Sequence, residues 1–410
     1  MHTKKNVALL AICQALSMTS ITMLFTVAAL IGSQLASDRS LATLPIALLQ
    51  VAVMFTTIPA SLLMQRRGRR FGFVVGTLVG IAGAGLGIWA VLEQNFPVFC
   101  GAMILLGIFN GFSGFYRFAA AEVAEEAFRA QAISLVVAGG VVAALVGPGL
   151  ASWAKDWFPA VFAGSLLPII ALQCVTLAVL AGIEMPPLEK VDLKGGRSLT
   201  GISERPLAGI SERPLSAIMR QPVFLIALLG SIIGYSVMVL IMTATPLAIV
   251  GFQHPFHEAA TVLQWHVLGM FAPSFFTGFL IARFGVLKII LCGIALNLIC
   301  VAINATGVDI FHFRAALLFL GIGWNFLFIG STTLLTQTYT PAEKAKTQAA
   351  HDFLMFSCVA IAAYLSGRVL TSGGWAVVNY AALPGLAIAL IAVLGYQQQT
   401  IRQVKDQQID

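Results

Sequence analysis

Residues 65–70 read Gln65-Arg66-Arg67-Gly68-Arg69-Arg70 and place four cations within six residues of a chain that has few charges. Such a run suits a nucleic-acid patch or a loop between membrane spans. Its neighbours decide between the two, because residues 41–64 and 71–93 contain almost no charge and are each long enough to cross a bilayer. We therefore predict a short loop between two spans and no nucleic-acid partner. Gly68 suits a tight turn, since glycine permits backbone conformations that a side chain obstructs.

The rest of the chain repeats this pattern of long apolar runs. Of its 410 residues, 59% are hydrophobic and only 10% are charged, and a mean hydropathy of +0.91 exceeds what a soluble domain needs to cover its surface. A helix needs about 20 apolar residues to cross a membrane. We therefore predict an all-α integral membrane protein with twelve transmembrane helices. The expected spans are residues 6–33, 41–64, 71–93, 97–121, 131–153, 159–184, 222–248, 259–282, 287–307, 314–338, 349–371 and 375–396.

The distribution of Lys and Arg predicts the orientation of these spans. With the N-terminus inside, the inner segments contain nineteen of these residues and the outer loops contain four. Membrane proteins keep an excess of Lys and Arg on the cytoplasmic side, so we expect both termini in the cytoplasm. The remaining cation, Arg117, falls inside the fourth predicted span.

A segment of different composition separates the sixth and seventh spans. It is rich in charge and contains the sequence Gly-Ile-Ser-Glu-Arg-Pro-Leu twice, at 201–207 and at 209–215. A Pro in each copy does not suit a long helix, so we predict a solvated linker. The duplication indicates either a regulatory binding motif or a slip in a tolerant loop. The predicted parts are an N-terminal six-helix bundle at 1–184, the cytoplasmic linker at 185–221, a C-terminal six-helix bundle at 222–396 and a cytoplasmic tail at 397–410.

The two bundles show a weak internal repeat. The fourth and tenth spans align at a shift of 215 residues, which pairs Asn110 with Asn325 and Glu122 with Gln337. The basic loop at 65–70 has a counterpart after the eighth span, at Arg283-Phe284-Gly285. Internal repeats of this kind are typical of secondary transporters.

Neither the cysteines nor the histidines predict a metal site. All six cysteines fall in predicted spans, and none forms a Cys-x-x-Cys pair. His254, His257 and Glu258 lie close together in the sequence but are too few to hold a metal ion. We expect no metal, no cofactor and no disulfide framework.

The chain resembles the major facilitator superfamily over its whole length. The superfamily signature between helices two and three is Gly-x-x-x-Asp-Arg-x-Gly-Arg-Arg, and this chain has it from Ser61 to Arg70 with Ser61 and Gln65 as departures. Gly147-Pro148 in the fifth span is similar to the core of the superfamily's antiporter motif. The resemblance implies a bacterial inner-membrane permease that is a monomer and not an enzyme. It implies that a small-molecule solute crosses by alternating access, with a proton or sodium as the coupling ion.

The resemblance also implies a gate on the cytoplasmic side. Superfamily members place the signature arginines against an acid at the end of helix four, so Glu122 is expected to pair with Arg66 or Arg69. Gln65 stands where the family has Asp, and Asp352 in the first turn of the eleventh span is expected to replace the missing charge. The residues assigned to the gate are Gln65, Arg66, Gly68, Arg69, Glu122, Arg129, Gly147, Pro148, Arg283, Gly285 and Asp352.

Residues within the spans define a candidate solute site. An ionisable residue at membrane depth indicates a functional site by default. Arg117 therefore either contacts the solute or the gate, or it pairs with Glu122 near the cytoplasmic surface. His266 in the eighth span either relays protons or holds a neighbouring helix. Neutral polar and aromatic residues complete the set. The candidate solute-binding residues are Arg117, Tyr116, Asn110, Gln14, Thr22, Gln50, His266, Trp265, Trp324 and Asn325.

The kinds of residue in the spans indicate the kind of solute. No Asp or Glu lies deep in any predicted span, which favours a neutral or anionic organic solute over a cationic drug. A flat aromatic vitamin such as riboflavin suits an aromatic, neutral-polar site with one Arg. Two other functions stay open, namely a drug or metabolite efflux antiporter and a membrane sensor that has the fold without transport.

Overall fold

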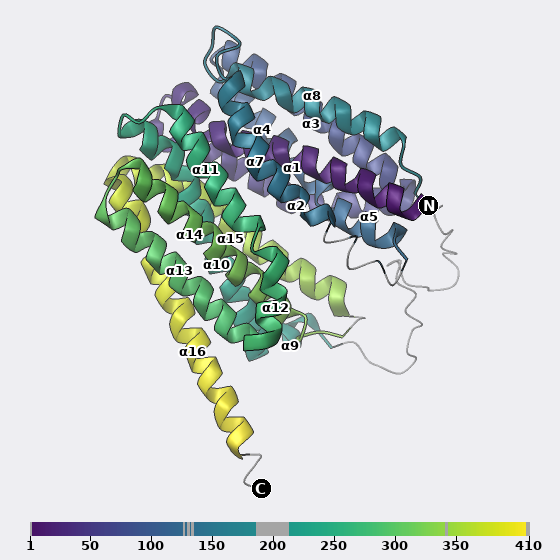
Figure 1. Cartoon of the computed structure of the whole chain (residues 1–410), viewed down its shortest axis with the longest axis vertical. Helices are drawn as coiled ribbons and strands as arrows, with labels where there is room; N and C mark the ends of the chain where they lie inside the picture. Colours follow the sequence, from purple (N-terminus) through teal and green to yellow (C-terminus); the bar gives the residue numbers. More distant parts are fainter. Residues whose placement is uncertain are drawn as a thin grey trace.

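The chain folds into two bundles of helices (Figure 1). The computed structural model describes residues 2–125, 128, 132, 135–185, 213–340 and 343–406, and every regular element within them is a helix. The first bundle contains α1 (His2–Leu35), the 3-10 helix η1 (Arg39–Leu41), α2 (Leu44–Arg67), α3 (Arg69–Leu92), α4 (Phe96–Ser113), α5 (Tyr116–Val123), α7 (Gly139–Ala154) and α8 (Ala163–Ala181). The second bundle contains α9 (Leu215–Met219), α10 (Pro222–Gly251), α11 (Phe256–Phe271), α12 (Ser274–Phe284), α13 (Val286–Thr306), α14 (Ile310–Leu335), α15 (Lys344–Tyr380) and α16 (Leu383–Asp406).

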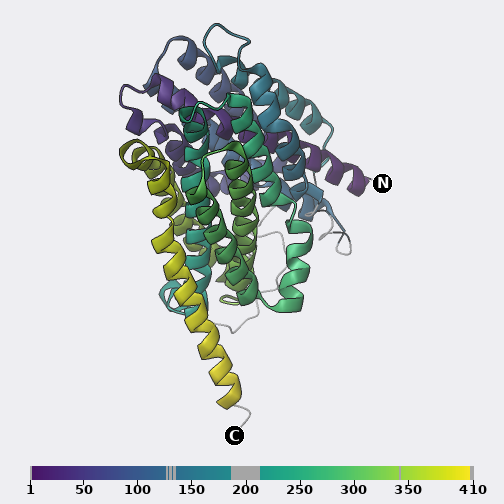
Figure 2. The same cartoon turned by 60° about the vertical axis from the view of Figure 1, so that its left-hand side comes forward.

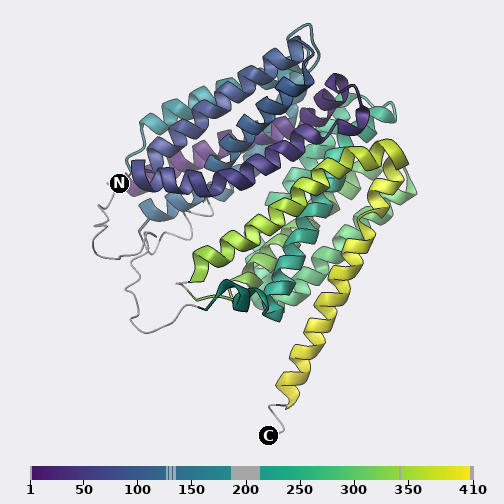
Figure 3. The same cartoon turned by 180° about the vertical axis from the view of Figure 1, so that it is seen from behind.

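The helices account for the predicted number of spans. Ten helical segments of the described chain are long and apolar enough to cross a membrane, and the bent pair α11 and α12 makes an eleventh. One of the ten, Lys346–Thr400, has 55 residues, or about 80 Å of helix against a hydrocarbon core of about 30 Å. Gly374 leaves the helical conformation within it, at φ 76°, and α16 then runs back from a turn at Ala381 and Ala382 (Figure 3). This segment therefore crosses twice, which gives twelve spans.

Two predicted boundaries are wrong. The last span was expected to begin at residue 375, but α16 begins at Leu383; it continues to Asp406, beyond the rest of the bundle (Figure 2), so the predicted tail at 397–410 is helical as far as Asp406. The break at Gly374 delays its start, and glutamines 397–399 are good helix formers. The sixth span begins at Ala163 rather than at residue 159, because the chain first turns and Phe162 adopts a left-handed φ of 71°.

The two bundles share one unusual loop conformation. Gly68 joins α2 to α3 at φ 94° and ψ 153°, and Gly285 joins α12 to α13 at φ 91° and ψ 149°. Each glycine also donates its N–H to a carbonyl four residues earlier, at 2.8 Å for Gly68 and 2.9 Å for Gly285. L-amino acids rarely adopt this region. The expectation that Gly68 provides a special backbone conformation is confirmed, and the match supports an internal repeat.

The outer surface of the bundles is apolar. Phe55, Phe275, Phe279, Phe311 and Ile391 are each more than half exposed. Soluble proteins rarely expose large apolar side chains in such numbers, whereas lipid tails accommodate them. The structure therefore confirms a membrane protein.

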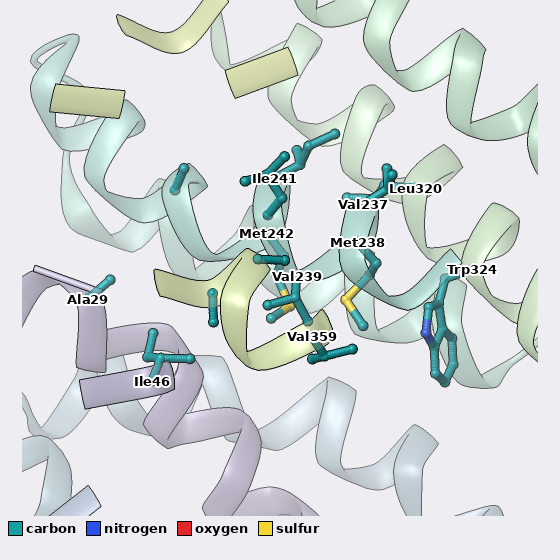
Figure 4. Packing of buried hydrophobic residues seen from close by; sticks show 14 of the residues in the cluster. Ala29, Ile46, Val237, Met238, Val239, Ile241, Met242, Leu320, Trp324 and Val359 are labelled. Carbon is teal, nitrogen blue, oxygen red and sulfur yellow. The ribbon is translucent and has the colours of Figure 1, made fainter. Parts of the chain in front are cut away.

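The two bundles meet at one end and diverge at the other (Figure 3). We call the end that holds the 65–70 loop and Arg283 the basic end. At the opposite end, Thr43 of the first bundle accepts a hydrogen bond from the N–H of Gly367, at 3.0 Å. Figure 4 shows Ala29 and Ile46 of the first bundle across from Met242 of α10. The polar and charged residues near the basic end thus lie on bundles that spread apart there.

Candidate solute site and gate between the two bundles

Five aromatic side chains from four helices of the second bundle form one cluster, which we call the aromatic cluster. They are Tyr235 of α10, Phe271 of α11, Trp324 and Phe328 of α14, and Phe356 of α15. Trp324 and Phe328 lie one helical turn apart and stack in parallel, with ring centroids 5.0 Å apart and planes inclined by 8°. Tyr235 presents an edge to both rings, at 5.5 and 5.8 Å. The cluster therefore offers both the flat and the edge contacts that aromatic ligands prefer.

The aromatic cluster lies beside the first bundle. A Cβ atom on Gly140 of α7 would come within 2.7 Å of the Phe271 ring, so only glycine permits this approach. On α15, Ser357 follows Phe356, and its hydroxyl oxygen lies 3.4 Å from the Met54 sulfur of α2. Both contacts cross between the bundles. A solute held by this cluster would therefore also meet the first bundle.

Among the buried polar atoms of the described residues that lack a hydrogen-bond partner, one belongs to Trp324 and one to Gln14. These atoms are Nε1 of Trp324, within the aromatic cluster, and Oε1 of Gln14, on α1. A buried donor or acceptor without a partner costs about 1–3 kcal/mol. Both atoms are therefore available to a polar ligand group, and both belong to residues that the sequence singled out.

Asn325 of α14 instead serves the protein itself. It is 1% exposed and donates to the carbonyl of Met270 and to the hydroxyl of Ser274, each at 2.7 Å, while it accepts from Thr277 at 2.7 Å. These three residues flank the break of 43° between α11 and α12. Since both of its N–H groups are used, Asn325 holds the bend and has no donor left for a solute.

Tyr116 and Thr22 also pack within the first bundle. Tyr116 is 1% exposed and stacks on Phe73, with centroids 4.1 Å apart. Thr22 donates to the carbonyl of Ala143 at 3.2 Å, and a Cβ on Gly147 would come within 2.0 Å of its hydroxyl oxygen. Gly147, followed by the buried Pro148, therefore lets α1 and α7 approach closely. The predicted solute role of Tyr116 and Thr22 finds no support in these contacts.

The predicted histidine and its neighbour point in different directions. His266 is fully buried, and its Nδ1 lies 2.9 Å from the Leu317 carbonyl, which requires a proton on that nitrogen. This contact supports the second of the two roles considered, in which His266 holds a neighbouring helix, while its Nε2 has no partner among the described residues. Trp265 is 45% exposed.

On the first bundle, Gln50 is buried in α2 and Asn110 is half-buried in α4, where it accepts a hydrogen bond from Ser113 at 3.5 Å.

The signature loop forms the expected ion pair. Arg69 binds Glu122 through two hydrogen bonds, of which Nε to Oε2 measures 3.0 Å. Arg69 rather than Arg66 is therefore the partner of Glu122. No hydrogen bond between Arg117 and Glu122 is found among the described residues, so the alternative that these two residues pair stays a prediction. Arg70 donates to the carbonyl of Ala181 at 3.0 Å, so it also fastens α3 to the end of α8.

Asp352 lies beside a histidine that the sequence interpretation overlooked. His351 Nδ1 is 3.0 Å from Oδ1 of Asp352, and its Nε2 is 3.0 Å from the hydroxyl of Ser231 on α10. Asp352 is half exposed and acts electrostatically on Arg117 of the first bundle. The expectation that Asp352 replaces the carboxylate missing at Gln65 stays a prediction. The sequence signal for His351 was its position next to the only acid at the start of that span.

The second loop carries less charge. Arg283 lies with its guanidinium carbon 5.4 Å from the ring centroid of Phe284, and Gly285 provides the turn described above. Arg129 lies outside the described residues, as do residues 186–212 of the predicted linker.

One residue of the linker duplication makes a buried contact. Arg213, from the second copy, binds Glu343 through Nε at 2.9 Å and Nη2 at 2.7 Å, and it donates to the Thr338 carbonyl at 2.9 Å. The Glu343 side chain is 2% exposed. The Arg213 hydrogen bond, with those from Thr340, holds the pKa of Glu343 well below its usual value. We call this contact the Arg213 clamp; no motif in the sequence pointed to Glu343 as the partner of Arg213.

A hollow of about 400 Å³ lies elsewhere, at the end of the second bundle opposite the basic end. It is lined by Phe252, Asn304, Gly307 and Trp375, among others. None of the predicted solute residues lines it, so it is separate from the aromatic cluster.

Two six-helix bundles with an apolar outer surface, an aromatic cluster at their interface and an ion-paired loop define a membrane transporter of the alternating-access class. The sequence model of the Major Facilitator Superfamily matches residues 10–265. The chain belongs to this superfamily, and the predictions of the family, the fold and a transport function are confirmed.

Relatives of known name cover almost the whole chain. It is 39% identical to the riboflavin transporter RfnT of Brucella anthropi over 395 residues, which are 95% of each chain. It is 27% identical to the MFS-type transporter YdeG of Bacillus subtilis, over 91% of this chain and 87% of that one. Its structure is similar to a mutant of the nucleoside transporter NupG, with a TM-score of 0.69 over 95% of this chain and 99% of that chain. At 13% identity, this last likeness shows the fold alone.

Proposed function

We propose that this transporter imports riboflavin, and that the aromatic cluster holds the flat isoalloxazine ring. The observation that carries the proposal is the stacked pair of Trp324 and Phe328 with Tyr235 edge-on to both. Aromatic contacts of this geometry each add about 0.5–1.5 kcal/mol beyond the apolar area they bury. The similarity to RfnT supports the same solute.

The polar atoms of riboflavin match the unpaired groups of Trp324 and Gln14. The ring system has carbonyl oxygens, which accept hydrogen bonds, and Trp324 Nε1 is a buried donor without a partner among the described residues. The ribityl chain has hydroxyl groups, which can donate to Gln14 Oε1 on the first bundle. A solute that joins Trp324 to Gln14 would connect the two bundles, as alternating access requires.

The orientation follows from the charge distribution. Because most Lys and Arg residues lie on the segments at the basic end, that end belongs in the cytoplasm of a bacterial inner membrane, with both termini there. The divergence of the bundles at that end then represents the cytoplasm-facing state. The protein acts as a monomer, holds no cofactor and catalyses no covalent reaction.

A matched pair of tryptophans tests the solute and the site. Riboflavin fluorescence is quenched when the ring stacks on tryptophan, so quenching on titration of the purified transporter reports binding. Trp324→Ala is expected to raise the Kd about tenfold or more, since it removes about 1.5 kcal/mol of ring contacts. Trp265→Ala, at an exposed tryptophan, is expected to leave the Kd unchanged.

Uptake in cells that cannot synthesise riboflavin tests the direction. Cells that produce the transporter are expected to grow on low external riboflavin, and cells with Trp324→Ala to need more. Riboflavin that binds equally to both tryptophan variants, or uptake that does not depend on the transporter, would contradict the proposal.

A further inference from the structure

A chain of three polar side chains leads from the interface into the second bundle at the start of α15. Asp352 is half exposed, His351 is 2% exposed, and Ser231 is fully buried on α10. An ionised carboxylate only accepts hydrogen bonds, so His351 donates through Nδ1 to Asp352, at 3.0 Å. Nε2 then accepts from the Ser231 hydroxyl, at 3.0 Å. The aspartate connects the buried histidine to the space between the bundles.

The opposing charge comes from the other bundle. Arg117 of α5 is exposed and lies close enough to Asp352 for the two to interact electrostatically. Its guanidinium carbon is 4.8 Å from the ring centroid of Phe118, its neighbour on the same helix. The cation and the acid therefore belong to the two parts of the molecule that have to approach when the basic end closes.

Several other charged or titratable groups lie on the described elements around this pair. Asp352 also acts on Tyr339, whose hydroxyl accepts a hydrogen bond from Gln348. Helices α9 and α10, which pack on α15, contain no charged residue, and α10 contributes only the phenol of Tyr235. Glu343, at the start of α15, is engaged by Arg213. The other charged residues on elements that contact α15, or on α15 itself, are Arg39, Arg66, Arg67, Lys288, Lys344, Lys346, Arg368, Arg402, Lys405 and Asp406.

We propose that His351 and Asp352 together form a proton-binding site, and that Arg117 is the counter-charge through which this proton controls closure of the basic end. The inference rests on the solute transport proposed above and adds the coupling ion. Histidine is the side chain whose charge changes most readily between pH 5 and 8. The hydrogen bond of 3.0 Å between the two side chains puts one proton within reach of both.

The charge of the pair sets the attraction between the bundles. Without the extra proton, the neutral imidazole and the carboxylate carry a net charge of −1, which attracts Arg117 and favours closure. A proton that the pair takes up from water through the half-exposed Asp352 makes the net charge zero and removes this attraction. Ser231 accommodates either state, because a hydroxyl donates to a neutral Nε2 and accepts from a protonated one.

This order of events couples a proton to import. A proton that arrives from outside with the solute releases Arg117 and lets the basic end open. Loss of that proton to the cytoplasm restores the attraction and closes the empty carrier. If His351 only ties α15 to α10, replacing it would not separate accumulation of the solute from its exchange.

Proteoliposomes with riboflavin as the probe distinguish these roles. The variants are His351→Gln and Asp352→Asn, and the matched controls are His257→Gln and Asp156→Asn at exposed positions. A gradient of one pH unit is expected to let the wild type and both controls accumulate riboflavin about tenfold, at one proton per solute. The two site variants are expected to lose accumulation but to keep exchanging labelled for unlabelled riboflavin without a gradient.

Variants that accumulate riboflavin like the wild type would overturn the inference. So would variants that lose exchange and accumulation together, because that result indicates a structural role. A wild type that exchanges no riboflavin would instead disprove the proposed solute.

In that event a measurement without solute still tests the site. Spin labels at Phe71→Cys and Phe284→Cys, in a background without other cysteines, report the distance between the basic ends of α3 and α12. Raising the pH is expected to shorten this distance in the wild type and to have no effect with Asp352→Asn. A pH response that survives Asp352→Asn would overturn the inference.

Discussion

The two glycine loops have the same backbone and different charges. Gly68 and Gly285 adopt φ and ψ values within about 4° of each other. The residue after Gly68 is Arg69, which pairs with Glu122, whereas Val286 follows Gly285 and Gln337 aligns with Glu122. The internal repeat therefore reproduces the geometry of the turn without its ion pair. In the second bundle an ion pair lies at a different place, in the Arg213 clamp.

Among the tests of how the two bundles differ, substitution of the aligned residues Asn325 and Asn110 has the largest expected effect. Asn325→Ala is expected to lower the free energy of unfolding by about 2–4 kcal/mol, because it leaves several buried partners at the α11–α12 bend without hydrogen bonds. Asn110→Ala, at the aligned position, is expected to cost about 0.5 kcal/mol or less. Denaturant unfolding of the purified protein measures both. Equal losses would contradict the different roles assigned to the two residues.

Alanine at the two loop glycines tests the shared backbone. Gly68→Ala and Gly285→Ala are each expected to cost about 1–3 kcal/mol, since the added Cβ meets no atom within 4 Å but strains the backbone. Gly278→Ala in α12 is the control, because its Cβ also has free space and its backbone is helical. It is expected to be neutral or stabilising by up to about 1 kcal/mol. Unequal losses of stability in Gly68→Ala and Gly285→Ala would count against the inference that the two loops are copies of one turn.

Acid should affect the Arg213 clamp in one direction. The pKa of Glu343 is lowered in the folded protein, chiefly by the Arg213 hydrogen bond. Its contribution to stability is therefore complete above the ordinary glutamate value of about 4.3 and is lost as the pH falls through the lower folded value. Glu343→Gln is expected to lower Tm by several degrees at neutral pH and to flatten the decline of Tm below pH 5. Asp156→Asn serves as the exposed control, and a steep acid decline that persists in Glu343→Gln would exclude this assignment.

The ion pair of the first loop should contribute least to stability. Arg69 and Glu122 are 24% and 35% exposed, so Arg69→Gln is expected to cost about 0.2–1 kcal/mol. Val286→Arg combined with Gln337→Glu places the same pair in the second bundle, where a similar gain is expected. Unfolding measured at low and high salt checks both, since salt screens an exposed pair. A loss above about 2 kcal/mol would show that the pair is more than an exposed contact.

The sequence was informative where one property of a segment decided its place. Long apolar runs predicted the spans, and the Gln65–Arg70 loop with its weaker copy predicted two related bundles. Helix ends were harder, because the start of α16 depends on the break at Gly374 and not on hydropathy. The Arg69–Glu122 pair was predictable, since a family pattern named both partners.

Side-chain partners within the spans were less accessible to sequence reasoning. Asn325 and Asn110 align, yet only the fold brings Asn325 to the bend between α11 and α12. Tyr116 looks like a cavity aromatic until Phe73 is seen to cover it. His351 was missed because its hydrogen-bond partner, Ser231, lies 120 residues earlier in the sequence, on another helix. Helical spacing gives a side chain its direction around its own axis, but the crossing of two helices decides what it meets.

The bend of 43° in the eighth span separates two segments that have different neighbours. Its α11 segment is fastened to the first bundle, where Gln264 donates to the Leu145 carbonyl at 2.9 Å. Its α12 segment packs on α13 and α14 of its own bundle. The eighth span is therefore bent, and the hydrogen bonds of Asn325 hold the angle between its two segments. Because His266 and Asn325 also hold the α11 segment to α14, α11 belongs to the second bundle and still reaches the first, which keeps Phe271 at the surface where the two bundles meet.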